Sequence, residues 1–195
     1  MNQVLCNIDT FLLDMDGTIY LSDGLIDGAL DFLKELKRRG KKYIFLTNNS
    51  SKNRFDYVKK LKGLGIDAGV DDVFTSGEAS VIYLRERYPG GKCYLLGTPS
   101  LEKEFTDAGF ELIKERDREI DFVLLGFDTT ITYEKIWVAC DYIRGGVPFY
   151  ATHPDVNCPL AGGKFMPDTG SMLRLFEASA GVSPVIIGKP YEPII

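Results

Sequence analysis

Strand and helix signals alternate along almost the whole chain, and this alternation limits the possible folds more than any other feature. Apolar runs such as residues 92–96 and 121–127 are separated by amphipathic stretches such as residues 29–39 and 133–144. Parallel strands need a crossover connection, which is usually a helix, so this order favours a parallel sheet flanked by helices. We therefore predict an α/β fold, and 195 residues with 45% hydrophobic content suffice to bury a real core.

Residues 11–18 form an apolar run that ends in two aspartates one position apart, followed by a glycine and a threonine. Side chains alternate faces along a strand, so Asp14 and Asp16 are expected on one side and Met15 on the other. Two carboxylates this close repel each other unless a cation lies between them or their protonation states are split for chemistry. The alternative is an ordinary Asp-Gly turn whose carboxylates cap backbone amides.

Residues 42–50 are a second apolar strand, which ends in Thr47, Asn48 and Asn49. Ligands of open α/β sheets collect at the carboxyl ends of the strands, so Thr47 and Asp14 are expected to face one bound group if their strands are neighbours. The alternative is that residues 47–51 cap the following helix.

Residues 184–190 are a third apolar strand, and it places Lys189 between a glycine and a proline. A single ammonium at a strand end suits the neutralisation of an anionic ligand. An isolated Gly-Lys-Pro would by default be a turn with a solvated lysine, because lysines are mostly exposed. The other two strand ends favour the functional interpretation.

The segments Asp14-Met15-Asp16-Gly17-Thr18, Thr47-Asn48-Asn49 and Gly188-Lys189-Pro190 resemble motifs one, two and three of the haloacid dehalogenase superfamily. The insertion between the second and third motifs resembles the type IIA cap of the p-nitrophenylphosphatase or NagD-like phosphatases. This resemblance implies a Rossmann-like parallel-sheet core, residues 1–78 and 184–195, with an inserted α/β cap of the C2 type, residues 79–183.

The resemblance also implies an activity, the Mg²⁺-dependent hydrolysis of a small phosphomonoester through an aspartyl-phosphate. Asp14 would be the nucleophile, and Asp16 would be the general acid and base. Mg²⁺ would bridge Asp14 and the phosphate, with the backbone carbonyl of Asp16 as a further ligand. The groups expected to orient and neutralise the phosphate are Thr47, Asn48, Asn49 and Lys189.

Residues 153–170 are rich in Pro, Gly, Asp and Asn and are predicted to form a long loop. By resemblance this loop belongs to the part of the cap that selects the leaving group. Asp155, Asn157 and Cys158 are therefore candidate substrate-binding residues. The alternative is a solvated loop with capping residues.

One departure from the family pattern concerns a fourth, acidic motif of the type Gly-Asp-x-x-x-Thr-Asp, which is expected after Gly-Lys-Pro and does not occur in the sequence. We therefore expect these 195 residues to be part of a longer chain. If they are the whole protein, the alternative is a non-catalytic phosphometabolite-binding or interaction protein. A phosphotransferase or mutase is a third possibility.

Composition excludes several other classes of function. The formal charge of −5 argues against nucleic acid or an acidic membrane surface as the main partner. No signal peptide is expected, because residues 1–10 lack a basic start and a 7-residue apolar core, and no 18-residue apolar run follows. The cysteines are far apart and predict reduced thiols in a cytoplasmic protein; they are Cys6, Cys93, Cys140 and Cys158. His153 is the only histidine, and no Gly-x-Ser-x-Gly elbow or Walker loop is present. The resemblance adds a possible homodimer through the cap.

Overall fold

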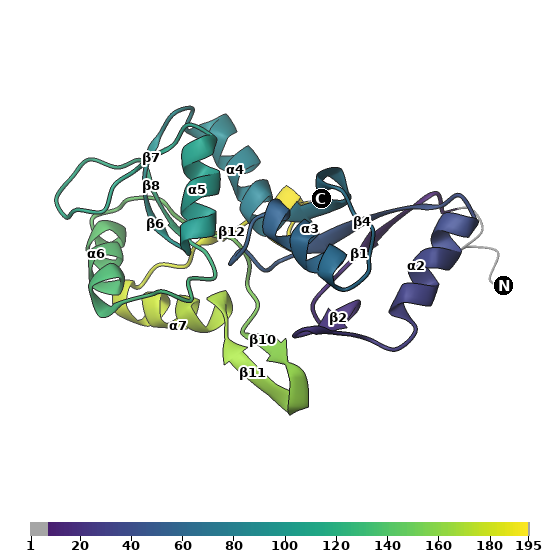
Figure 1. Ribbon diagram of the computed structural model, residues 1–195. Helices are drawn as coiled ribbons and strands as arrows, with labels where there is room; N and C mark the ends of the chain where they lie inside the picture. The colour runs from purple at the N-terminus through teal and green to yellow at the C-terminus, as the bar shows by residue number, and fades with distance from the viewer. Residues whose placement is uncertain (1–7, 195) are drawn as a thin grey trace. The chain divides into compact units, whose positions relative to one another are not determined.

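The computed structural model of the protein describes residues 8–194 and divides them into two compact units (Figure 1). The first unit takes residues 8–47, 54–74 and 159–165, and the second takes residues 48–53, 75–158 and 166–194. Each unit has a sheet and a hydrophobic core of its own.

The first unit is built on a sheet of the order β1-β4-β5, with β1 at Thr10–Leu13, β4 at Lys42–Thr47 and β5 at Val73–Thr75. Strands β1 and β4 are parallel, so their carboxyl ends lie at one edge of the sheet. Helices α2 (Ala29–Arg38) and α3 (Arg54–Gly63) contribute to its core. A short antiparallel pair, β2 (Tyr20–Leu21) and β3 (Gly24–Leu25), follows the aspartate turn.

The second unit is built on a five-stranded parallel sheet of the order β12-β9-β8-β6-β7. Its central strand β8 is buried throughout, as expected of an apolar run inside a parallel sheet. The strands are β6 (Lys92–Leu96), β7 (Glu111–Leu112), β8 (Phe122–Leu125), β9 (Phe149–Ala151) and β12 (Val185–Ile186).

Threonine caps begin three of the helices of the second unit. The side chains of Thr75, Thr98 and Thr132 each accept a hydrogen bond from the backbone N–H three residues later, which satisfies one of the free amides of the first turn. The helices of this unit are α4 (Ser76–Arg87), α5 (Pro99–Asp107), α6 (Tyr133–Arg144) and α7 (Thr169–Ala180). Helices α6 and α7 pack side by side (Figure 1).

The predicted α/β class with a parallel sheet is confirmed. The prediction that residues 153–170 form a loop is wrong, because they contain a two-stranded sheet of β10 (Asn157–Leu160) and β11 (Lys164–Pro167). The turn η2 (Ala161–Gly163) joins the two strands, and it closes because both of its glycines have positive φ, +73° and +71°. The core and cap boundaries stay a prediction; β12 pairs with β9 in the second unit.

None of the helices formed by residues 8–194 has the length and apolar character needed to cross a lipid bilayer.

Candidate functional site

Asp14 and Asp16 flank a fully buried methionine where β1 ends. Met15 has no exposed surface, whereas both aspartates are partly exposed, which is the alternation expected from the sequence. Thr18 Oγ1 donates a weak 3.4 Å hydrogen bond to Asp14 Oδ2, and Tyr20 Oη lies 3.5 Å from Asp16 Oδ2. Both carboxylates therefore reach the surface of the first unit at the end of one strand.

The turn that carries these carboxylates is held by its own backbone. The Met15 carbonyl accepts from the N–H groups of Thr18 and Ile19 at 3.1 and 2.9 Å, and Gly17 N–H donates to the Tyr20 carbonyl at 2.8 Å. Gly17 has φ +83°, a left-handed conformation that glycine adopts without steric cost. The backbone conformation of the turn thus explains why a glycine stands at position 17.

Thr47 is the last residue of β4 and is 1% exposed. The parallel register pairs Leu13 with Phe45, so Asp14 and Thr47 both lie just past this pair at the carboxyl edge of the sheet. The first unit therefore brings Asp14, Asp16 and Thr47 to one edge, as the sequence predicted for neighbouring strands.

Asn48 holds the main chain of Lys189 from both sides. Asn48 Oδ1 accepts from Lys189 N–H at 2.8 Å, and Asn48 Nδ2 donates to the Lys189 carbonyl at 3.0 Å. The second Nδ2 hydrogen serves Asp155 Oδ2, also at 3.0 Å. The second unit thus brings Asn48, Lys189 and Asp155 together across 141 positions of sequence. A substrate-binding role for the Asn48 side chain stays a prediction.

The remaining candidates lie near the same loop of the second unit. Asn49 Oδ1 accepts from Ser51 N–H and Ser51 Oγ at 3.1 and 2.6 Å, which closes a side-chain turn, and Asn49 Nδ2 lies 3.9 Å from the buried Cys158 Sγ. Asn157 is exposed at the start of β10. Cys93, Cys140 and Cys158 are buried, and Cys6 lies outside the described residues.

No role was predicted for His153, which is fully buried in the second unit. His153 Nε2 lies 2.8 Å from Asp168 Oδ1, and His153 Nδ1 lies 2.9 Å from Thr152 Oγ1. Thr152 Oγ1 in turn lies 2.9 Å from Ser50 Oγ. The only available signal was the position of Thr152 and His153 directly after an apolar strand, because Asp168 and Ser50 are distant in sequence.

The turn at Asp14 and Asp16 supplies some, but not all, of the oxygen ligands that a hard divalent cation needs. Mg²⁺ prefers oxygen ligands and is usually held by one or two carboxylates together with waters and substrate phosphates. The turn offers two carboxylates that reach the surface, but within residues 8–194 no group of three His, Cys, Asp or Glu side chains converges on a point. The residues present suit a cation that completes its shell with water and substrate.

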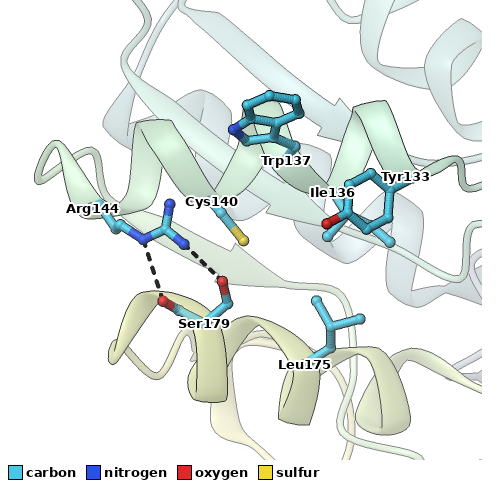
Figure 2. A pocket seen from close by; sticks show the side chains of 7 residues that line it. All are labelled: Tyr133, Ile136, Trp137, Cys140, Arg144, Leu175 and Ser179. Atoms are coloured by element: carbon cyan, nitrogen blue, oxygen red, sulfur yellow. Dashed lines mark hydrogen bonds between the residues drawn. The ribbon is translucent and has the colours of Figure 1, made fainter.

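Two surface cavities lie away from these strand ends. One, of about 440 Å³, lies between α6 and α7 (Figure 2), and its only charged lining residue, Arg144, donates to the carbonyl and hydroxyl of Ser179. The other, of about 480 Å³, lies at the amino ends of β1 and β4, where Lys37, Lys41 and Lys42 are accompanied by two aspartates. Neither has the polar groups at a strand's carboxyl end that the predicted chemistry requires.

Residues 11–111 match the family of haloacid dehalogenase-like hydrolases. The chain is 40% identical to an acid sugar phosphatase of Staphylococcus aureus over 185 residues, which are 95% of this chain and 70% of that one.

Solved structures similar to this chain are also phosphatases. A 4-nitrophenylphosphatase from Thermotoga maritima is 45% identical, with a TM-score of 0.87 over 96% of this chain and 70% of that one. A glycerol phosphate phosphatase from Mycobacterium tuberculosis, solved with magnesium, is 27% identical, with a TM-score of 0.88 over 96% of this chain and 56% of that one. These similarities agree with the p-nitrophenylphosphatase branch that the motifs predicted.

Proposed function

We infer, since this chain belongs to the haloacid dehalogenase-like hydrolases, that it hydrolyses a small phosphomonoester through an aspartyl-phosphate. One observation carries the proposal: Asp14 and Asp16 reach the surface on either side of a buried methionine, at the sheet edge where Thr47 also ends its strand. Two carboxylates in one turn provide a nucleophile and a proton carrier, which are the two groups that this chemistry requires.

The proposed reaction has two steps. In the first, an Asp14 carboxylate oxygen forms a bond to phosphorus, the ester P–O bond breaks, and the Asp16 carboxyl gives its proton to the leaving alkoxide. In the second, Asp16 takes a proton from water as the water oxygen bonds to phosphorus, and the P–O bond to Asp14 breaks, releasing inorganic phosphate. Covalent catalysis of this kind divides one difficult step into two easier ones.

The phosphoryl oxygens carry charge that must be neutralised in the transition state. We assign this task to the Lys189 ammonium, with the Thr47 hydroxyl, the backbone N–H of Asn48 and donors of Asn49 fixing the orientation of the phosphate. Lysine suits the role because its ammonium is a compact point charge. Asp14 and the Asp16 carbonyl would hold Mg²⁺, which when bound supplies further positive charge to the phosphate oxygens.

The proposed substrate is a small phosphorylated metabolite. The relatives' names, an acid sugar phosphatase and a glycerol phosphate phosphatase, support this class of substrate. We propose Asp155, Asn157 and Cys158 as the residues that contact the leaving group, within a cap of residues 79–183 inserted in a core of residues 1–78 and 184–195.

The test is hydrolysis of p-nitrophenyl phosphate with and without Mg²⁺. Asp14→Asn should remove measurable turnover, and Asp16→Asn should lower kcat by about 10²–10⁴, the usual contribution of general acid–base catalysis. Both variants should keep the far-UV circular dichroism spectrum of the unaltered chain.

Asp31→Asn is the matched control, because it makes the same charge change at an exposed position of α2. It should leave kcat within about twofold of the unaltered chain. A folded Asp14→Asn variant that retains turnover would exclude the aspartyl-phosphate mechanism. A folded, unaltered chain that binds phosphate without turning over substrate would instead support a phosphometabolite-binding role.

A further inference from the structure

A chain of four buried side chains crosses the second unit between two of its loops. Ser50, Thr152 and His153 have no exposed surface, and Asp168, the N-cap residue of α7, is 3% exposed. Successive members lie 2.9, 2.9 and 2.8 Å apart. Buried polar groups are normally retained only when hydrogen-bonded, so such a chain acts as a single unit.

The partners determine where the protons of this chain lie. Asp168 Oδ1 accepts from Thr169 N–H at 2.6 Å and, as a carboxylate, requires the proton on His153 Nε2. In the neutral ring, Nδ1 is then an acceptor and takes the Thr152 hydroxyl proton. Ser50 Oγ accepts from Phe127 N–H at 2.9 Å and donates to Thr152. With a neutral His153, every donor in the chain meets an acceptor.

Ser50 and Thr152 connect this chain to the Lys189 loop. Ser50 lies two residues from Asn48, whose carboxamide holds both backbone groups of Lys189. On the other side, Gly188 packs directly on the strand end, since a Cβ built at that position would collide with the Thr152 carbonyl and lie 2.9 Å from His153 Cβ. The Lys189 main chain is therefore fixed by two segments that the Ser50–Thr152 hydrogen bond joins.

We propose that His153 is a positioning residue that fixes the Lys189 main chain through Thr152 and Ser50. The Nδ1 atom carries this role, because it receives the Thr152 proton and so orients the hydroxyl that meets Ser50. The Nε2 atom anchors the ring on Asp168. The proposal rests on the proposed function, in which Lys189 neutralises the phosphoryl group.

Two isosteric variants separate the two nitrogen atoms. In His153→Asn, a carboxamide oxygen at the place of Nδ1 still accepts from Thr152, while the partner of Asp168 is lost. In His153→Gln, a carboxamide nitrogen at the place of Nε2 still donates to Asp168, while the acceptor for Thr152 is lost. Thr152→Val cuts the same link and also removes the acceptor of the Ser50 hydroxyl.

The proposal predicts opposite orders for stability and activity. His153→Asn should have the lower Tm, because a buried carboxylate that loses its donor costs more than a neutral hydroxyl does. His153→Gln and Thr152→Val should nevertheless lose more activity, about tenfold in kcat with little change in KM, because a small displacement of a charge-stabilising group affects the transition state most. His153→Asn should retain kcat within about threefold.

Tyr88→Phe is the control for loss of one hydroxyl hydrogen bond elsewhere in this unit, to Tyr150 at 3.0 Å, and should keep kcat unchanged. Activity losses that follow Tm in all variants would overturn the positioning role.

A readout independent of turnover is amide hydrogen exchange of Lys189 N–H, measured by NMR. Exchange should be faster in His153→Gln than in His153→Asn or the unaltered chain. If the unaltered chain lacks phosphatase activity, the proposed function fails, and this exchange measurement still decides whether His153 positions Lys189. Equal protection of Lys189 in both variants would refute the proposal.

Discussion

At the scale of single residues, the Asn48 side chain of the second unit holds the backbone of a distant loop. Asn48 uses both Nδ2 hydrogens and its Oδ1 on Asp155 and on the Lys189 main chain. Its backbone carbonyl accepts from the buried Ser76 hydroxyl. The Asn48 side chain therefore fixes two loops, one that carries Asp155 and one that carries Lys189. A substitution of Asn48 would move Lys189 as well.

Gly188→Ala tests how closely these loops pack. A Cβ at this position would collide with the Thr152 carbonyl and would lie 2.7 Å from Asn48 Oδ1, which cannot move without breaking its hydrogen bond to Lys189 N–H. We expect the variant to lose about 1–3 kcal/mol in the free energy of unfolding, the usual cost of overpacking. Urea unfolding measures this, and Gly63→Ala, at the end of α3 with open space around it, is the control. Equal stability of the two variants would contradict the packing argument.

Cys93 should be inert in the folded chain. Burial, with a smaller effect of the Asp121 charge, raises the pKa of its thiol to about 12, so almost no thiolate exists at pH 8. Iodoacetamide at pH 8 should therefore label Cys93 only after unfolding, as measured by mass spectrometry of its peptide. Labelling of the native chain at the rate found in urea would show that the site opens locally.

At the scale of elements, α2 shows how a helix end gains charge complementarity. Glu35 accepts from Arg38 Nε and Arg39 Nε, both at 2.6 Å, in the last turns of the helix, where cations also suit the macrodipole. These two hydrogen bonds lower the pKa of the Glu35 carboxyl to about 2. The charged form of Glu35 is therefore favoured by folding.

Glu35→Gln should consequently change the acid sensitivity of the fold. A lowered pKa in the folded state stabilises the protein above the ordinary value of 4.5, and the benefit disappears as the pH falls toward 2. The Tm of the variant should lie below that of the unaltered chain at pH 6, and the difference should shrink steadily from pH 4.5 downward. Glu86→Gln, an exposed site on α4, is the control. A Tm difference independent of pH would contradict the assignment.

Elements that bury an apolar face were predictable, and elements that do not were missed. Strand β6 lies where residues 92–96 were predicted, and α6 coincides with the predicted helix 133–144, because an apolar run marks the strand and the apolar residues of the helix follow its period. The strand β11 is exposed along its whole length, so no alternation of burial signals it. Its hairpin depends on two glycines of positive φ rather than on a core.

At the scale of the whole molecule, the sequence located the strand ends but not the contacts between them. Each of the motifs at Asp14, Thr47 and Lys189 is a short continuous segment that follows an apolar run. For this reason each could be predicted from the sequence. The contacts of His153 with Asp168 and of Thr152 with Ser50 join residues that are 15 and 102 positions apart, and such proximity arises only from the tertiary fold. A short-range sequence pattern therefore predicts which polar side chains lie at strand ends. It does not predict which distant residues they contact.

The separation of 141 residues between Asn48 and Lys189 sets the order of events on the ribosome. At about 5–20 residues per second, roughly 7–28 s pass between synthesis of these two residues. Throughout that interval the Asn48 carboxamide has no Lys189 backbone to hold, and β12, the last strand of the five-stranded sheet, is completed only three residues before Lys189. The lysine loop is therefore closed only after most of the second unit has been translated.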